Sequence, residues 1–259
     1  MERKNQPPAA TATGTTPTVP SRLSESVKRV AARLDSPEHA ARKQALDADQ
    51  AARDREDEAA DVRQFRLRLW RERGSRYEKC TLEHFITRNA AQRKVVAAMM
   101  DYAADLRGYV GGGRGLLLLG PSGTGKDHLV AALFNPAVDA RLSVKWISGA
   151  LLFSRLRERI DSTGESERKL LEEFTLPNIL AISDPVPVGC ELTGYQRVML
   201  YQIVDARYNN RRPCWVTINA SSGAEVDAKL GAPIVDRLRD GALSLACDWP
   251  SYRKSFSRE

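Results

Sequence analysis

The alternation of apolar and polar residues changes near residue 77. From there, short apolar runs alternate with longer segments in which apolar residues recur every three or four positions, the spacing of a helix with one buried face. The runs predict strands at 115–119, 143–148, 178–183, 214–219 and 242–247. The longer segments predict helices at 90–110, 126–135, 149–160, 165–174, 195–210 and 232–240. Buried strands separated by helices predict an α/β fold whose parallel sheet is covered on both faces.

The first part of the chain has a different composition. Residues 1–21 are rich in Pro, Thr and Ala and offer little to bury, so we expect a disordered tail. Residues 22–75 mix Ala and Arg with Asp and Glu, and Asp35, Ser36 and Pro37 form a helix-start signal. This predicts a charged helical arm, which is either solvated or a binding site for a partner. Residues 76–259 then form one folded domain.

Charge and cysteine usage narrow the class of protein. The 259 residues carry a formal net charge of +7, which favours anionic partners without requiring them. The cysteines Cys80, Cys190, Cys214 and Cys247 form no C-x-x-C pair, which argues against a zinc site and a disulfide framework. No apolar run approaches the ~18 residues of a membrane span, so we expect a cytoplasmic protein without membrane contact.

One motif carries specific chemistry. The stretch from Gly120 to Lys126 fits G-x-x-x-x-G-K and lies between a predicted strand and a predicted helix, the context that this phosphate-binding loop requires. Its glycines let backbone N–H groups point at phosphate oxygens, and Lys126 would reach the β- and γ-phosphates. The expected contacts with ATP come from Gly120, Pro121, Ser122, Gly123, Thr124, Gly125, Lys126, Asp127 and His128.

The residue after the lysine is unusual. Asp127 stands where such loops place the Ser or Thr hydroxyl that binds Mg²⁺. A carboxylate is also a hard oxygen ligand, so Asp127 remains a candidate magnesium ligand. The alternative is an ordinary acidic residue in the first turn of a helix.

A second acidic group should follow another strand. The apolar residues 179–182 lead into Ser183 and Asp184, where the usual pattern has two acidic residues. Either Ser183 takes the first acidic position and Asp184 the second, or Asp184 takes the first and Pro185 the second. In both cases one carboxylate is missing. Asp184 is therefore the second candidate magnesium ligand, and either slow hydrolysis or binding without turnover is expected.

Two polar residues complete the predicted site. Asn219 follows the strand at 214–218 and should reach the same edge of the sheet, where α/β proteins bind ligands. Arg237 lies in the helical segment LGAPIVDRLRDG and is either a functional or a solvated arginine.

The order of GPSGTGKDHLVAAL, NILAISD, QIVDARYNNRRPCWVTIN and LGAPIVDRLRDGALSLACDWPSYR resembles the DnaC/IstB group of AAA+ ATPases, over 77–253. The resemblance implies a P-loop NTPase fold and makes Lys126 the ATP-binding lysine, Asp184 the Walker B acid and Asn219 a sensor. Arg237 would be an arginine finger for a neighbouring subunit, and Arg253 a weaker candidate for a second sensor. Twelve residues follow Cys247, so no C-terminal lid domain is expected, as in that group.

The resemblance also implies partners. It predicts an ATPase that forms ATP-dependent homo-oligomers and acts on single-stranded DNA with a replicative helicase or a transposase. Candidate DNA contacts are Lys145, Trp146, Phe153, Arg155, Arg157 and Arg159, although Trp146 and Phe153 also fit the core. The alternative functions are a nucleotide-gated scaffold that does not hydrolyse ATP and a small-molecule kinase, for which no convincing basic lid is present.

Overall fold

The computed structural model describes residues 21–34, 36–158, 164–186 and 189–253. The chain divides into two compact units, Met1–Ala59 and Ala60–Glu259. The tail expected at residues 1–21 lies, except for Ser21, outside the described residues. Within the described part, no helix is both long enough and apolar enough to cross a bilayer.

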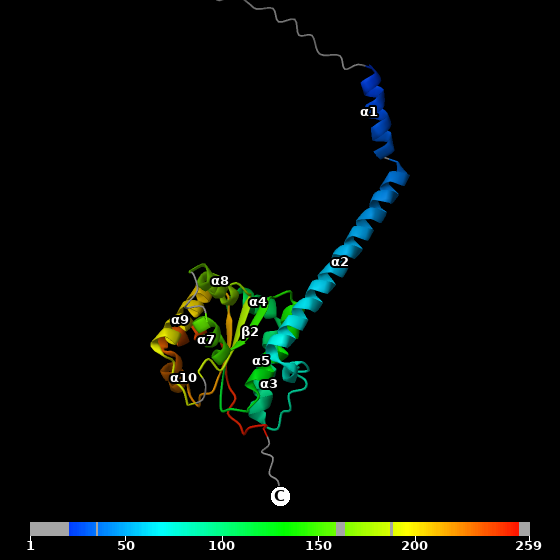
Figure 1. Cartoon of the computed structure of the whole chain (residues 1–259). Coiled ribbons are helices and arrows are strands. Elements are labelled where there is room, and N and C mark those ends of the chain that lie inside the picture. The colour runs from blue at the N-terminus through cyan, green and yellow to red at the C-terminus, as the bar shows by residue number, and fades with distance from the viewer. Residues whose placement is uncertain (1–20, 35, 159–163, 187–188, 254–259) are drawn as a thin grey trace, which may run out of the picture. The chain divides into compact units, whose positions relative to one another are not determined.

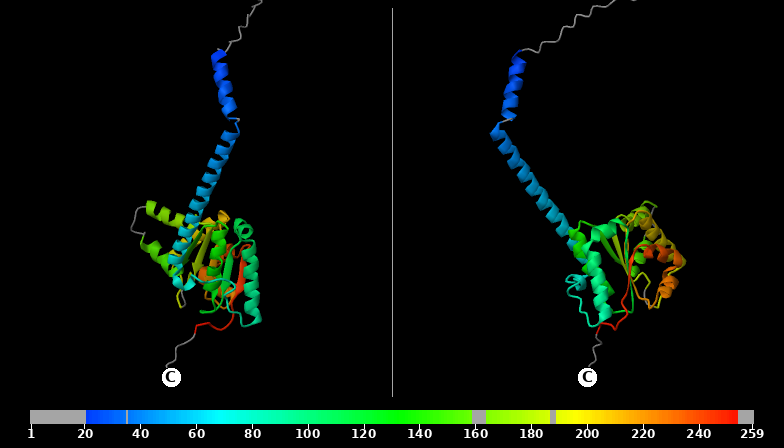
Figure 2. Two further views of the ribbon diagram at one scale, coloured as in Figure 1. Left: turned by 90° about the vertical axis from the view of Figure 1, so that its right-hand side faces the viewer. Right: turned by 180° about the vertical axis from the view of Figure 1, so that it is seen from behind.

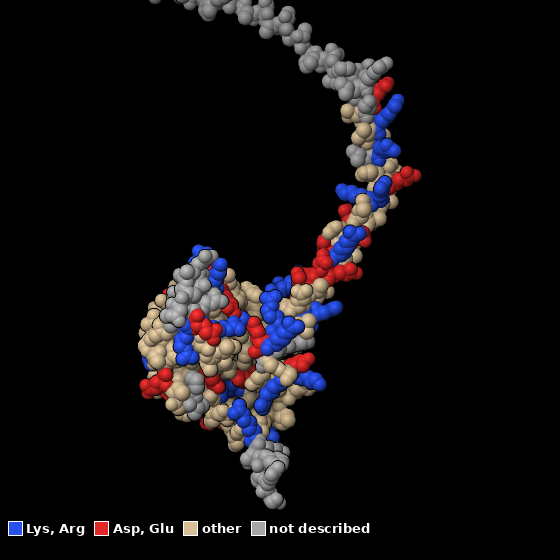
Figure 3. Space-filling view, in the orientation of Figure 1, with Lys and Arg blue, Asp and Glu red and all other residues tan. Residues whose placement is uncertain are grey.

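The predicted arm is helical. Its helices are α1 (Ser21–Leu34) and α2 (Pro37–Arg73), and the hydroxyl of Ser36 accepts a hydrogen bond from His39 N at 3.2 Å at the start of α2. Both acidic and basic side chains are exposed along α2, with acidic residues concentrated in its middle and basic residues toward its end (Figure 3). Pairs such as Arg53 with Asp49, 2.8 Å apart, form within the helix.

The last turns of α2 belong to the second unit. Leu69 is buried in that unit's core, and Phe65 packs against it. The Nζ of Lys145 lies 2.7 Å from the Glu72 carboxylate. The compact unit therefore begins at Ala60, earlier than the boundary expected at residue 75, because the end of the helix carries the apolar side chains.

All five predicted strands form one parallel sheet. They are β1 (Leu116–Leu119), β2 (Val144–Ser148), β3 (Ile179–Ser183), β4 (Cys214–Ile218) and β5 (Leu243–Ala246). Their order in the sheet is β2-β3-β4-β1-β5, which places β1 between β4 and β5. Helices cover both faces of this sheet (Figure 1, Figure 2).

Successive side chains of each strand point to opposite faces of the sheet, so the core consists of two halves, one on each face. Leu116 and Leu118 of β1 face one half, and Leu117 faces the other. The first half is closed by α3 (Ala90–Ala104), α4 (Leu106–Gly111), α5 (Lys126–Ala132) and α6 (Phe134–Asp139). The second is closed by α7 (Gly149–Glu158), α8 (Gly164–Thr175), α9 (Gly194–Asn209), α10 (Gly223–Leu230) and α11 (Ala232–Arg239).

The helices differ from the prediction in three places. The helix expected at 90–110 is divided at Asp105, whose carboxylate accepts a hydrogen bond from Gly108 N and so starts α4. The helix expected at 126–135 is interrupted at Leu133, because the ring of Pro136 excludes a continuous helix through the preceding turn. Helix α10 was not predicted, since Val226 and Leu230 are its only buried residues among those described.

One buried arginine forms hydrogen bonds with separate chain segments next to the second half of the core. Arg207 of α9 is fully buried. Its guanidinium donates to the carbonyls of Phe174 at 2.8 Å, Asn178 at 3.1 Å and Pro213 at 2.8 Å. These carbonyls lie at the end of α8 and just before β3 and β4. Burial lowers the pKa of Arg207.

We expect Arg207→Ala to lower the free energy of unfolding by about 3 kcal/mol, because it leaves buried carbonyls without a donor. Arg207→Lys should recover only part of this loss, since one ammonium cannot reach the same set of carbonyls. Urea unfolding measures the effect. The control is Arg93→Ala at an exposed position of α3, expected to stay within ~0.5 kcal/mol of the unmodified protein. Equal stability of the two alanine variants would contradict this role for Arg207.

Candidate nucleotide-binding site

The phosphate-binding loop follows β1 at the carboxyl edge of the sheet. Gly123 and Gly125 have φ angles of 84° and 90°, a region that side-chain-bearing residues rarely adopt. A Cβ at Gly125 would lie 2.7 Å from the ring of Phe85. Both glycines are therefore required by the path of the loop.

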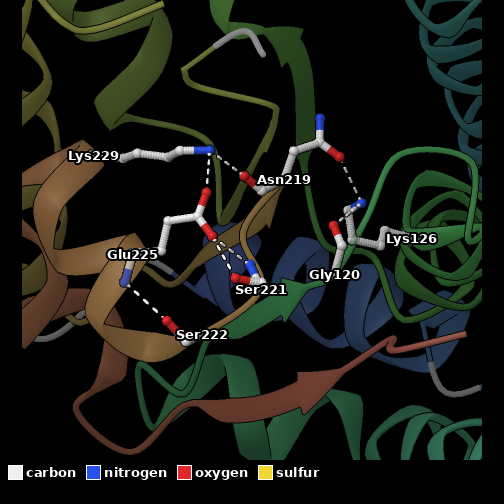
Figure 4. A network of polar contacts seen from close by, with 7 residues as sticks. All are labelled: Gly120, Lys126, Asn219, Ser221, Ser222, Glu225 and Lys229. Carbon is white, nitrogen blue, oxygen red and sulfur yellow. Dashed lines mark hydrogen bonds and ion pairs between the residues drawn. The ribbon is translucent and has the colours of Figure 1, made fainter. Parts of the chain in front are cut away.

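Lys126 is buried within this loop, with an exposed fraction of 5%. Its Nζ donates to the carbonyls of Gly120 and Pro121, both at 2.8 Å, and to Asn219 Oδ1 at 2.9 Å. The contacts with Gly120 and Asn219 are visible in Figure 4. Burial lowers the pKa of Lys126, and the nearby carboxylate of Asp184 opposes that shift. The ammonium group is held where β1 and β4 end.

Asn219 is positioned by helix α10. Lys229 of this helix donates to the main-chain carbonyl of Asn219, and its Nζ lies 2.8 Å from the Glu225 carboxylate (Figure 4). Glu225 also accepts hydrogen bonds from Ser221 N at 2.7 Å and Ser221 Oγ at 2.8 Å. Together, Lys229 and Ser221 lower the pKa of Glu225 to about 2. This network fixes the turn that presents the Asn219 amide to Lys126.

Asp127 receives hydrogen bonds from the ends of two strands. Ser183 Oγ of β3 donates to Asp127 Oδ2 at 2.8 Å, and Thr217 Oγ1 of β4 donates to Oδ1 at 2.7 Å. The hydroxyl of Tyr77 is farther away, at 3.4 Å from Oδ2. Burial and the neighbouring Asp127 raise the pKa of Tyr77.

Asp184 follows directly after β3. Its φ is 44°, in the left-handed region, and such strain in a residue other than glycine is concentrated at functional sites. Its Oδ1 is buried and has no hydrogen-bond partner among the described residues. Burial raises the pKa of Asp184, the Asp127 carboxylate raises it further, and Lys126 opposes both.

The end of β3 bears on the two ways of counting the acidic positions. Ser183 is the last strand residue, pairs in register with Thr217 and contacts Asp127. This geometry favours Ser183 at the first acidic position and Asp184 at the second, an assignment that stays a prediction.

Lys126, Asp127, Asp184 and Asn219 line one cleft of about 300 Å³. The structure brings together the predicted residues Lys126, Asp127, His128, Asp184 and Asn219 in its wall. The opposite wall comes from the segment before α3, which was not predicted to contribute: Arg76, Tyr77, Cys80, His84, Phe85 and Ile86. That segment lacks both a motif and a regular spacing, so its sequence carries no signal for a site.

The segment after β5 packs against the phosphate-binding loop. Trp249 Nε1 donates to Thr124 O at 2.9 Å, and Tyr252 N donates to Gly123 O at 2.9 Å. Tyr252 and Phe85 contact each other edge to face, with ring centroids 5.6 Å apart. Arg253 lines the cleft, and its guanidinium lies 3.4 Å from Ser122 Oγ. Its role as a second sensor stays a prediction.

Arg237 is not among the residues that line this cleft. Its Nε donates to Asp205 at 2.7 Å, and its NH2 donates to the Tyr201 hydroxyl at 2.9 Å. Its guanidinium also lies over the Tyr201 ring, 4.8 Å from the centroid. The predicted action of Arg237 on a neighbouring subunit stays a prediction and requires these bonds to be released.

Of the two alternatives for Trp146 and Phe153, the structure supports a place in the core rather than a stacking surface for DNA. Trp146 is buried between Phe134 and Tyr77, with ring centroids 5.5 and 6.0 Å away, and Phe153 is also buried. Both fill the core because their strand and helix direct them inward.

The basic residues that were also candidates for DNA contacts are, where the structure describes them, not buried in the core. Lys145 and Arg155 both form ion pairs with Glu173, at 2.8 and 2.7 Å. Arg157 is exposed, and Arg159 lies outside the described residues.

Comparison with known proteins identifies a family model and relatives that match most of the chain. A family model described as IstB-like ATP binding protein matches residues 39–259. The replicative helicase loader DnaC of Escherichia coli strain K12 is 30% identical over 178 residues, which cover 68% of this chain and 70% of that protein. DnaC of Buchnera aphidicola subsp. Acyrthosiphon pisum is 28% identical over 181 residues, covering 69% and 71%.

Solved structures agree on the fold. The crystal structure of the DnaC helicase loader superposes with a TM-score of 0.58 at 21% identity and covers 67% of this chain and 99% of its own. The crystal structure of DnaI gives a TM-score of 0.55 at 21% identity, covering 65% and 90%. The architecture is thus that of these P-loop proteins, a parallel sheet of five strands flanked by helices.

Asp184→Asn should stabilise the protein in the absence of ligand at neutral pH, because it removes a buried negative charge next to Asp127. The raised pKa of Asp184 means that the folded state favours its protonated form. The unmodified protein therefore loses stability relative to Asp184→Asn as the pH rises through that pKa. In acid, where Asp184 is protonated, the stabilities of the two proteins converge. We expect a melting temperature about 3 °C higher at neutral pH, the shift typical of ~1 kcal/mol in a domain of this size. A lower melting temperature for Asp184→Asn at neutral pH would contradict this electrostatic account.

Proposed function

The chain belongs to the family of IstB-like ATP binding proteins, and from this premise we propose that it binds ATP with Mg²⁺ in the described cleft and loads a replicative helicase. The observation that carries the proposal is Lys126, whose buried ammonium bonds the carbonyls of its own loop and the Asn219 amide. Phosphate oxygens are stronger partners for an ammonium than these neutral groups. Triphosphate binding would therefore exchange the carbonyls of Gly120 and Pro121 for phosphate.

The cleft also suits the rest of the ligand. Asp127 and Asp184, which line the cleft, offer the hard oxygen atoms that Mg²⁺ prefers, and the buried Oδ1 of Asp184 has no hydrogen-bond partner in the described part of the chain. When bound, the ion would neutralise charge on the phosphates. The aromatic side chains of Phe85 and Tyr252 supply an apolar wall for the base.

Hydrolysis is proposed to be slow. Asp184 alone remains to orient or activate a water molecule, since Ser183 replaces the other acidic residue at the strand end. Burial raises the pKa of Asp184, which strengthens it as a base, but the side chain shares the cleft with Lys126. The alternative is a scaffold that binds ATP without turnover.

Support for the partners comes from the relatives and from the surface. The two DnaC relatives described above are named replicative helicase loaders, and we assign the same partner to this chain rather than a transposase. Helix α1 carries exposed Val27 and Val30, which suit a protein contact. In the second unit, the end of α2 exposes Arg63, Arg68 and Arg71, which can contact DNA phosphates in place of the buried aromatic residues. Oligomers that form with ATP would use Arg237 across subunits.

Lys126→Ala should weaken ATP binding by at least about tenfold, because one charge-assisted contact with phosphate is lost. Isothermal titration calorimetry with ATP and Mg²⁺ measures this, and Lys94→Ala on the exposed side of α3 is the matched control. Wild-type affinity in Lys126→Ala would refute the proposed site.

The same variants separate an ATPase from a scaffold. With single-stranded DNA present, slow phosphate release that disappears in Lys126→Ala supports hydrolysis. ATP binding without any phosphate release supports the scaffold.

Removal of residues 1–59 should abolish helicase binding and leave ATP affinity unchanged, because the second compact unit begins at Ala60. A cut at residue 75 is unsuitable, since it would remove Leu69 from the core. Co-purification with the replicative helicase measures the first effect, and calorimetry measures the second. Undiminished helicase binding by the 60–259 fragment would contradict the assignment of the arm.

A further inference from the structure

Asp127, which lines the cleft, and Ser183, which contacts it, have the opposite side-chain types from those usual at their positions. In P-loop NTPases a hydroxyl follows the lysine of the loop, and an aspartate stands at the end of the Walker B strand. Here Asp127 follows Lys126, and Ser183 ends β3. The hydroxyl and carboxylate oxygen atoms lie 2.8 Å apart. The pair of groups is thus preserved while the elements that carry them are reversed.

We propose that Asp127 and Ser183 form a transposed metal-binding pair, in which helix α5 supplies the carboxylate for the Mg²⁺ of bound ATP and strand β3 supplies the hydroxyl. This rests on the proposed binding of ATP. Asp184 keeps the second acidic position. The carboxylate that is missing from β3 is therefore supplied to the same cleft by Asp127 of α5.

The charge of the cleft supports this assignment. The acidic residues among its described lining are Asp127 and Asp184, the number that the usual acidic pair would provide. Lys126 lies in the same lining and balances part of that charge. A purely structural Asp127 would leave the ion with a single carboxylate.

Asp127 also keeps capacity for a metal. A carboxylate has about four lone-pair sites, of which Ser183, Thr217 and the more distant Tyr77 hydroxyl occupy three. The bonds from Ser183 and Thr217 come from the last residue of β3 and the penultimate residue of β4, and they hold the side chain at the carboxyl edge of the sheet. Ser183 and Thr217 thereby orient the carboxylate without saturating it.

The test measures how strongly Mg²⁺ improves ATP affinity. Calorimetric titrations of ATP into the full chain, with Mg²⁺ and with a chelator, give this gain for each variant. The variants are Asp127→Ser, the isosteric Asp127→Asn, Ser183→Asp and the double variant Asp127→Ser/Ser183→Asp. Asp101→Ser, which removes an exposed carboxylate of α3, is the matched control.

We expect the magnesium-dependent gain to fall by about tenfold or more in Asp127→Ser and Asp127→Asn. The double variant should recover it, because the carboxylate returns to the strand and the hydroxyl to the helix. Ser183→Asp alone should melt at a lower temperature without metal, since two carboxylates then face each other, and added Mg²⁺ should restore its stability.

An unchanged gain in either single Asp127 variant would overturn the inference, as would a folded double variant that recovers nothing. If the double variant does not fold, Asp127→Asn decides. In these cases wild-type binding of ATP leaves the proposed function intact. If the wild-type chain binds no ATP with or without Mg²⁺, the proposed function fails and the inference fails with it.

Discussion

The proposed binding of ATP depends on the electrostatic balance around one buried ammonium group. Lys126 lies where β1, β3 and β4 end, within a cleft that also holds the carboxylates of Asp127 and Asp184. Burial lowers the pKa of the lysine and raises that of Asp184, but the opposite charge of each group opposes the shift of the other and makes its charged form less costly. Without a ligand, loop carbonyls and an amide complete the bonds of the ammonium. The cleft therefore has matched polar groups that a triphosphate and a metal ion can take over.

Three parts of the surrounding fold hold these groups in place: the sheet, helix α10 and the segment after β5. The parallel sheet brings the ends of its central strands to one edge, as open α/β sheets do at their ligand sites. Helix α10 fixes the turn at Asn219 through Lys229 (Figure 4). The segment after β5 bonds to the loop through Trp249. A short glycine-rich loop is thus supported by chain segments that are distant in sequence.

Much of this arrangement could be predicted from the sequence because it depends on local patterns. Apolar runs located all five strands, and polar residues after them located Asp184 and Asn219 at one edge. Other features depend on tertiary contacts. Residue spacing places Trp146 on a strand of a covered sheet, but it does not identify Phe134 and Tyr77 as the side chains that pack against it. An arginine in a helix is usually exposed, so the burial of Arg207 follows only from the main-chain carbonyls that surround it in the structure. The hydrogen bonds of Asp127 need the register of Ser183 against Thr217, which residue spacing along the chain does not give.

The most direct test of the central claim is a crystal structure of the full chain with Mg²⁺ and a non-hydrolysable ATP analogue. The account predicts that Lys126 Nζ leaves the carbonyls of Gly120 and Pro121 and bonds the β- and γ-phosphates, with the ion beside Asp127. An analogue bound elsewhere, or phosphates in the cleft with Lys126 still bonded to its own loop, would contradict it.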